Sequence, residues 1–210
     1  MNPDLVVIGA GMVGAACAYY ASAAGLSVTV LERGAIVSGT SGAGEGNILV
    51  SDKAPGPELD LALYSNELWR ELSALPADRP GTGTVGDLIE FEEKGGLIVA
   101  GKAGVLAAIT ERAIELRQAG VQMQPLGTDQ LPDYEPHLAT GLAGGIFYPQ
   151  DLQVQPMLAA AHLLSRARRA NAIVHQHRPV TALLRKADRV TGVRTPAGDI
   201  HAGAVLNAAG

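Results

Sequence analysis

The feature that most constrains the fold is a glycine motif close to the N-terminus. Residues 9–14 read Gly-Ala-Gly-Met-Val-Gly, which is the spacing GxGxxG. A short apolar run at residues 4–8 precedes the motif, an alanine-rich helix is predicted over residues 12–24, and a second apolar strand is predicted at residues 27–31. Glu32 stands at the end of that second strand, 18 residues beyond the last glycine of the motif. A β-α-β unit of this kind, with an acidic residue after its second strand, is typical of dinucleotide-binding folds.

Each position of the motif has a physical task. Gly9 permits a sharp turn, Gly11 lets the backbone approach a pyrophosphate, and Gly14 lets the helix pack closely on the strand. The N-terminus of the helix supplies free N–H groups and a partial positive charge for phosphates. The Glu32 carboxylate can accept hydrogen bonds from ribose hydroxyls and would repel a 2′-phosphate, so NADP is disfavoured despite the neighbouring Arg33. These residues predict an adenine-dinucleotide site and leave FAD and NAD both open.

The pattern changes along the rest of the chain. Helices are predicted at about residues 57–74, 103–119 and 158–170, and short strands at 143–148, 173–177, 179–185, 189–194 and 198–207. Two apolar runs, at residues 87–92 and 96–100, flank the turn-prone residues 93–96 and predict a β-hairpin. This order of elements predicts an α/β fold in which a Rossmann-like domain is interrupted by part of an antiparallel α+β domain.

Composition excludes several classes of protein. Hydrophobic residues make up 47% of the 210 residues and charged residues 18%, which excludes intrinsic disorder. The net charge of −5 argues against a general nucleic-acid binder. Residues 151–210 do carry eight Lys and Arg against three Asp and Glu, but no aromatic residues interleave with Arg166, Arg168 and Arg169, so we interpret these arginines as a solvated helix face. No run approaches the ~20 apolar residues that cross a bilayer, so no integral membrane segment is expected.

Cysteine and histidine usage narrows the chemistry further. Cys17 is the only cysteine, so an internal disulfide is excluded and a reducing compartment fits. Because the N-terminus also lacks a basic segment typical of a signal peptide, we expect a cytoplasmic location. His175 and His177 would share one face of a strand, but no third ligand accompanies them, and no metal site is predicted.

Several longer motifs point to one family. Residues 39–47 read Gly-Thr-Ser-Gly-Ala-Gly-Glu-Gly-Asn, residues 92–99 read Glu-Glu-Lys-Gly-Gly-Leu-Ile-Val, and similar matches lie at residues 131–136, 144–156 and 205–210. Together with the N-terminal fingerprint, these motifs resemble the FAD-dependent amino-acid oxidase/dehydrogenase family, which includes glycine oxidase, D-amino-acid dehydrogenase and sarcosine oxidase. The resemblance covers essentially the whole chain. It implies FAD as the cofactor, residues 1–82 and 151–210 as a discontinuous FAD-binding domain, and residues 83–150 as a partial substrate domain.

The resemblance also implies a set of cofactor-binding residues. The pyrophosphate would lie at the glycine motif, the adenosine ribose at the residues after the second strand, and the isoalloxazine near the glycine-rich loop. In chain order the implied residues are Gly9, Gly11, Met12, Val13, Gly14, Glu32, Arg33, Thr40, Ser41, Gly46, Asn47, Ile48, Val180, Ala209 and Gly210. Val180 would contact the adenine through its backbone, and Ala209 and Gly210 would border the cofactor.

The reaction that the resemblance implies is oxidation of the C–N bond of an amino acid or secondary amine, with hydride transfer to flavin N5. The substrate would be a small amine or amino acid of the D-amino-acid, glycine, hydroxyproline or opine type. Family members often work in hetero-oligomers, so a partner subunit is implied. They usually hold the substrate carboxylate with an arginine and a tyrosine from a later part of the chain, so no catalytic residue is assigned, and the 210 residues are expected to be the N-terminal part of a longer enzyme, inactive alone.

Two other functions remain open on the sequence. An NAD-dependent dehydrogenase would use the same fingerprint, although it should continue with further β-α-β units after Glu32, where this chain has a glycine-rich loop. A cofactor-holding subunit without catalytic activity would fit the same residues. A purified protein that carries flavin would favour the first hypothesis over the NAD-dependent one.

Overall fold

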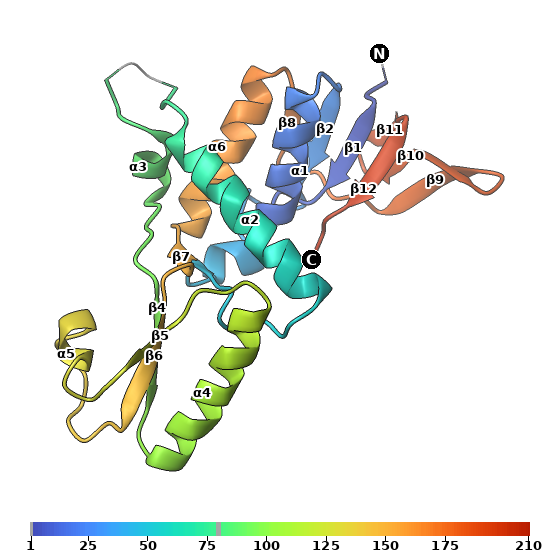
Figure 1. Cartoon of the computed structure of the whole chain (residues 1–210). Helices are drawn as coiled ribbons and strands as arrows, with labels where there is room; N and C mark the ends of the chain where they lie inside the picture. The colour runs from blue at the N-terminus through green and yellow to red at the C-terminus, as the bar shows by residue number, and fades with distance from the viewer. Residues whose placement is uncertain (1, 79–80) are drawn as a thin grey trace. The chain divides into compact units, whose positions relative to one another are not determined.

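The structure is a computed structural model that describes residues 2–78 and 81–210. The chain forms two compact units, which Figure 1 shows with their elements labelled. The first unit contains Met1–Glu45 and Gln155–Gly210, and the second contains Gly46–Val154. The chain therefore leaves the first unit within the glycine-rich segment of residues 39–47 and returns to it at Gln155, just before helix α6 (Pro156–Arg169).

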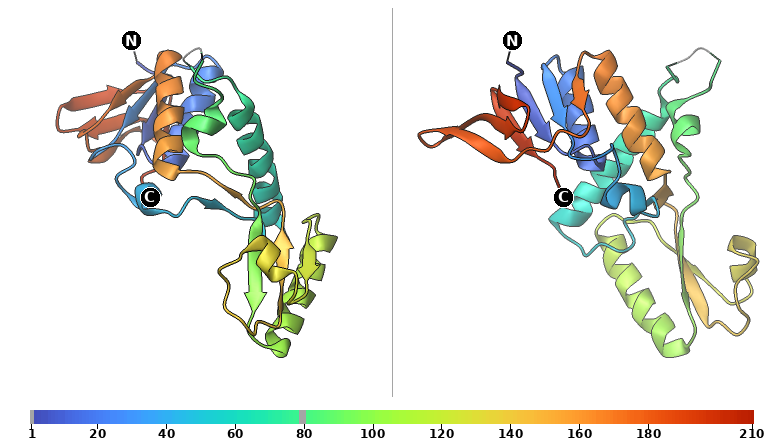
Figure 2. Two further views of the ribbon diagram at one scale, coloured as in Figure 1. Left: turned by 90° about the vertical axis from the view of Figure 1, so that its left-hand side faces the viewer. Right: turned by 180° about the vertical axis from the view of Figure 1, so that it is seen from behind.

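A parallel sheet forms the centre of the first unit. Its strand order is β12-β1-β2-β8, and the strands run over Ala204–Asn207, Leu5–Ile8, Val28–Leu31 and Ile173–His175. Helices α1 (Met12–Ala23) and α6 (Pro156–Arg169) pack against each other beside this sheet, as the two views of Figure 2 show. The predicted α/β fold with a Rossmann-like parallel sheet is confirmed.

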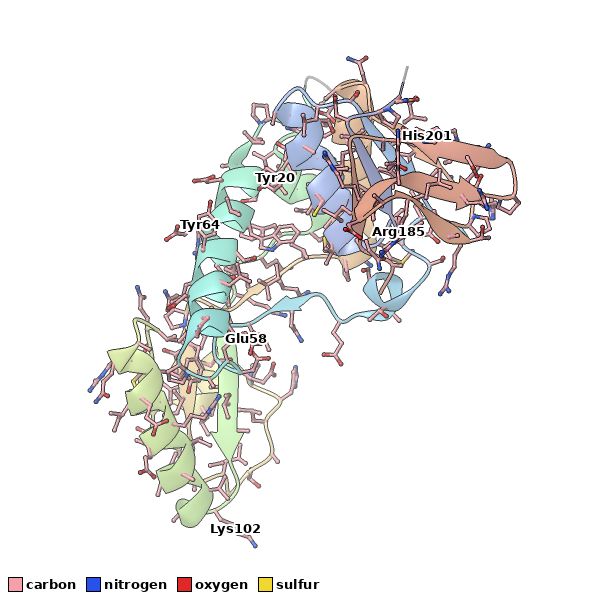
Figure 3. The ribbon with its side chains drawn as sticks, turned by 90° about the vertical axis from the view of Figure 1, so that its right-hand side faces the viewer. Tyr20, Glu58, Tyr64, Lys102, Arg185 and His201 are labelled. Carbon is pink, nitrogen blue, oxygen red and sulfur yellow. The ribbon has the colours of Figure 1, made fainter. Side chains whose placement is uncertain are left out.

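A smaller antiparallel sheet covers the other face of the parallel sheet. It has the order β11-β10-β9, over Gly198–His201, Arg189–Thr195 and Ala182–Lys186, and Figure 3 labels Arg185 and His201 on its two outer strands. Val6 and Leu31 of the parallel sheet form a buried cluster with Val193 of β10. Successive side chains of a strand point to opposite faces. The neighbouring Val7 therefore faces α1, where its Cγ1 lies 3.4 Å from the position of a Cβ on Gly14.

The second unit is built on an antiparallel sheet of order β4-β6-β5. These strands cover Gly96–Ala100, Gly144–Tyr148 and Gln124–Leu126, and the helices of the unit are α2 (Pro57–Ala74), α3 (Val85–Ile89), α4 (Ala103–Gln118) and α5 (Leu131–Tyr134). Leu59 of α2, Leu116 of α4 and Tyr148 of β6 share one buried cluster. The second unit includes residues 46–78 and 81–82. The predicted domains instead assign these residues to the FAD-binding part and begin the substrate part at residue 83. The assignment of the two parts to FAD and to substrate stays a prediction.

The predicted hairpin around residues 93–96 is wrong. Val85–Ile89 forms helix α3, and the strand Gly96–Ala100 pairs with β6 instead of with residues 87–92. A capping box starts the helix, because the Thr84 side chain accepts from the N–H of Asp87 while the Asp87 side chain accepts from the N–H of Thr84. Glu90 then ends the helix in the left-handed conformation with φ of 52°. The local hydrogen bonds of the cap outweigh the apolar pattern of the run.

The predicted strand over residues 198–207 is two strands. β11 ends at His201 and β12 begins at Ala204, and they belong to different sheets. Between them the N–H of Ala202 donates to the carbonyl of Thr191, and the N–H of Gly203 donates to the carbonyl of Pro3. A Cβ on Gly203 would lie 2.9 Å from the carbonyl oxygen of Asp4. The chain changes sheets at this glycine because only a residue without a side chain fits there.

Candidate functional site

The glycine motif forms the tight turn between β1 and α1. Gly9 has a φ of +102°, and a Cβ at this position would overlap the carbonyl oxygen of Ala208. A Cβ on Gly14 would overlap the carbonyl oxygen of Gly9. The N–H of Gly9 donates to the carbonyl of Leu31 at 2.8 Å, which joins the turn to the end of β2. Both glycines are required by backbone contacts, as their positions in the motif predict.

The N-terminus of α1 meets the glycine-rich loop. Gly11 is the N-cap and offers no side chain, and the Ser41 hydroxyl accepts the N–H of Met12 at 2.9 Å instead. A Cβ on Gly11 would lie 3.0 Å from this Ser41 oxygen, so the absence of a side chain makes room for an oxygen atom at the helix end. Val13 is exposed in the first turn. Polar oxygen ligands are favoured at such a position by the N–H groups and the helix dipole.

Glu32 connects the end of β2 to the glycine motif. One carboxylate oxygen, Oε2, accepts the N–H of Ala10 at 2.9 Å, and the other, Oε1, accepts the N–H of Gly34 at 2.8 Å. The side chain is half-buried, and neighbouring Arg33 is exposed. A carboxylate oxygen has two lone pairs, so each oxygen can still accept a hydroxyl group after these bonds are made. The acid is therefore held in a fixed orientation with acceptor capacity left for a ribose.

A buried valine fastens the glycine-rich loop to the motif. The N–H of Val37 donates to the carbonyl of Ala10 at 3.1 Å, and Val37 has a φ of 59° although it is β-branched. A Cβ on Gly42 would overlap the carbonyl oxygen of Val37. The Gln176 side chain adds a second tie, because its Oε1 accepts the N–H of Ile36 at 3.1 Å. Sequence reasoning missed Val37 and Gln176, since neither residue type signals a left-handed turn or a loop contact 140 residues away.

The predicted site residues fall into three groups. Twelve of the fifteen lie in the first unit, and the structure brings the glycine motif together with Glu32, Ser41 and the end of β12. At that end the N–H of Ala208 donates to the carbonyl of Ile8 at 2.8 Å, and Ala209 and Gly210 follow, both exposed. Val180 instead packs against the cluster between the two sheets of the unit. The remaining three, Gly46, Asn47 and Ile48, belong to the second unit, where Asn47–Ile48 forms strand β3.

Metal binding and membrane spanning are two further properties on which the described residues bear. Within the described ranges, no group of three or more His, Cys, Asp and Glu residues could hold a metal ion. The strand β8 ends at His175, and His177 lies beyond it with a φ of 54°, so the two histidines do not share a strand. Among residues 2–78 and 81–210, no helix is long and apolar enough to span a membrane.

Comparison with known proteins agrees with this geometry. The model of the family DAO, described as FAD dependent oxidoreductase, matches residues 4–210. The chain is 30% identical over 208 residues to 4-methylaminobutanoate oxidase (formaldehyde-forming) of Paenarthrobacter nicotinovorans, covering 98% of this chain and 24% of that protein. It is 28% identical over 244 residues to hydrogen cyanide synthase subunit HcnC of Pseudomonas aeruginosa, covering 99% of this chain and 57% of the relative.

Solved structures show the same fold. The crystal structure of glycine oxidase from Geobacillus kaustophilus matches with a TM-score of 0.88 and 27% identity, covering 100% of this chain and 56% of that one. The chain thus spans between about a quarter and a little over half the length of these relatives.

Proposed function

The chain belongs to the DAO family of FAD-dependent oxidoreductases, and from that premise we propose that its first unit binds the adenosine diphosphate part of FAD. The match of the family model to residues 4–210 confirms the resemblance that the sequence motifs indicate. The proposal rests on one arrangement above all: Glu32 and Ser41 both bond to the backbone of the glycine motif, through Ala10 and Met12. This arrangement supports the proposal because the Glu32 carboxylate can accept ribose hydroxyls and the nearby N-terminus of α1 suits phosphates.

The residues present fit the cofactor. The three glycines of the motif allow close approach of a ligand to the backbone, and Met12 and Val13 begin the helix that would face the pyrophosphate. Thr40 and Ser41 would supply hydroxyl groups beside it, and Arg33 would lie near the ribose held by Glu32. Val180 would contact the adenine through its backbone, and Ala209 and Gly210 would border the cofactor. Gly46, Asn47 and Ile48 would lie near the isoalloxazine. Bound FAD would supply the hydride acceptor for oxidation of a C–N bond.

We further propose that the substrate is a small amino acid or secondary amine, of the glycine, D-amino-acid, hydroxyproline or opine type. Two of the similar proteins are named for such compounds, since 4-methylaminobutanoate is a secondary amine and glycine is an amino acid. A partner subunit is part of the proposal, supported by the relative that is named as a subunit of hydrogen cyanide synthase. A cytoplasmic location is proposed as well, because the single cysteine suits a reducing compartment.

Purification of the chain tests the proposal. We expect it to carry flavin or to take up added FAD, visible as flavin absorption that migrates with the protein in gel filtration. Released cofactor should be identified by chromatography after heat denaturation. A colourless protein that takes up no FAD but binds NAD would overturn the proposal and favour an NAD-dependent dehydrogenase.

A further inference from the structure

A buried carboxylate in the second unit has no part in the site described so far. Asp151 lies between β6 and β7 (Leu152–Gln153), and only 1% of its surface is exposed. No Lys, Arg or His within the described ranges forms an ion pair with it. A buried carboxylate is unfavourable unless hydrogen bonds stabilise it. The donors that Asp151 contacts therefore indicate which part of the chain it stabilises.

The carboxylate binds the backbone of a segment 100 residues earlier in the chain. Its Oδ1 accepts the N–H of Val50 at 2.8 Å and the N–H of Ser51 at 3.2 Å. Val50 is fully buried and Ser51 is 5% exposed, so these bonds are shielded from water. Hydrogen bonds to a charged acceptor are stronger than those between neutral groups.

The rest of the residue is fixed as well. The carbonyl of Asp151 accepts the N–H of Gly95 at 3.1 Å, and its own N–H donates to the carbonyl of Tyr148 at 3.2 Å. A Cβ on Gly96 would overlap Oδ2, so the glycine leaves the space that the carboxylate occupies. The Asp151 side chain is therefore fixed by the hydrogen bonds to Oδ1 and by the space that Gly96 leaves for Oδ2.

The segment that Asp151 holds follows directly on β3. This strand is only two residues long, with Asn47 paired to Gln153 and Ile48 to Leu152 in the antiparallel sense. One further bond, from the N–H of Val154 to the carbonyl of Gly46 at 3.0 Å, extends the pair. A two-residue ladder is far shorter than the ~5–6 residues of an ordinary strand, and it fixes a segment weakly. The charged bonds to Val50 and Ser51 supply the second attachment.

We propose that Asp151 is a positioning residue for flavin binding, which holds residues 46–51 so that Gly46, Asn47 and Ile48 contact the isoalloxazine. This inference rests on the proposed function, because that function assigns residues 46–48 to the ring of FAD. The inference predicts different effects on the binding of FAD and of ADP. Loss of the Asp151 side chain should weaken the binding of FAD, which has the ring, and leave ADP binding unchanged, because ADP uses residues of the first unit.

The test compares Asp151→Ala, Asp151→Asn and a control, Asn66→Ala. Asn66 is also buried in the second unit and donates through Nδ2 to the carbonyl of Gln150 at 2.7 Å, so its loss removes a comparable polar contact beside Asp151. Affinities for FAD and for ADP are measured by calorimetry for each protein. Hydrogen exchange of the amides of residues 46–51 is measured without ligand.

We expect Asp151→Ala to lower FAD affinity about tenfold or more while ADP affinity stays within about twofold. Asp151→Asn keeps an acceptor oxygen for Val50 and Ser51 and should recover most of the FAD affinity. Asn66→Ala should leave the ratio of the two affinities unchanged. If Asp151→Ala does not fold, Gly96→Ala replaces it, because the added Cβ displaces the carboxylate.

Equal losses for FAD and ADP, or no loss for either, would overturn the inference. A wild-type chain that binds neither ligand would contradict the proposed function instead. In that case the amide exchange decides the anchoring role: faster exchange at residues 50 and 51 in Asp151→Ala but not in Asn66→Ala supports it, and unchanged exchange refutes it.

Discussion

The N–H of Ala10 donates to the Glu32 carboxylate at 2.9 Å, so the acid that ends β2 and the turn that begins α1 are joined directly. The second oxygen of the same carboxylate accepts the N–H of Gly34 at 2.8 Å. Glu32 therefore orients the backbone on both sides of itself, and each of its oxygens keeps a lone pair that can accept a hydroxyl group. The Glu32 side chain thus both holds the turn between β1 and α1 and presents carboxylate oxygens that can accept hydrogen bonds.

Replacement of Glu32 by glutamine should damage the site even though the shape is kept. Both carboxylate oxygens face N–H donors, so either orientation of the amide places an NH₂ group against a donor. We expect Glu32→Gln to weaken ADP binding by about 1–3 kcal/mol, the range for lost hydrogen bonds to a charged group. Calorimetric titration with ADP measures this. Asp188→Asn, at an exposed acid of the same unit, is the control and should change nothing; an unaltered affinity of Glu32→Gln would show that Glu32 is not at the ribose.

Gly14 should tolerate no side chain. A Cβ there would overlap the carbonyl oxygen of Gly9, so Gly14→Ala must push α1 away from β1. We expect a loss of stability of about 1–3 kcal/mol, typical of overpacked sites. Urea unfolding followed by circular dichroism gives the value. In α4, a Cβ on Gly104 would meet nothing within 4 Å, and Gly104→Ala should stabilise the chain by about 0.5–1 kcal/mol; similar effects of the two variants would refute this account of the motif.

Sequence reasoning succeeded where chemistry requires one residue type. The tight turn at the glycine motif, the helix that follows it and the next parallel strand could be predicted, because turn geometry and helix packing leave few alternatives to glycine at residues 9 and 14. The ribose contact of Glu32 stays a prediction. It failed at residues 87–92, where an apolar run resembles a strand although Thr84 and Asp87 start a helix. The spacing of those two residues is a readable cap signal. Asp151 could not be found in this way, because its role depends on Val50 and Ser51, which are 100 residues away.

The turn between β9 and β10 contains a residue that is unfavourable for its conformation. Ala187 has a φ of 51° between the paired residues Lys186 and Arg189. Such a conformation costs an L-residue about 1–2 kcal/mol and costs glycine little. We expect Ala187→Gly to raise the free energy of unfolding by up to about 1 kcal/mol.

The matched control for this turn is Ala197→Gly, in the turn between β10 and β11. Ala197 does not have a positive φ. The glycine there should only add freedom to the unfolded chain and lower stability by about 0.5–1 kcal/mol. Thermal unfolding of both variants checks the pair, and a loss of stability in Ala187→Gly would show that the turn differs from the one described.

The cap of α3 should make stability depend on pH. The backbone N–H of Thr84, and then its hydroxyl, lower the pKa of Asp87 below its usual value of 3.8. A carboxyl group whose pKa is lower in the folded state stabilises the fold above its unfolded pKa, and this contribution is lost as the pH falls through the folded value. Asp87→Asn should therefore lower the melting temperature at pH 7, and the difference from wild type should shrink below about pH 4. A difference that is constant from pH 7 to pH 3 would contradict the cap.

A competition titration shows whether the glycine motif, Glu32 and the glycine-rich loop form the proposed FAD site. FAD is added to the purified chain and its binding is followed by flavin fluorescence, after which ADP and NAD are added in separate titrations. We expect FAD to bind at least about tenfold more tightly than NAD and to be displaced by ADP. NAD affinity equal to or above that of FAD, or FAD that ADP does not displace, would show that the glycine motif is not an FAD site.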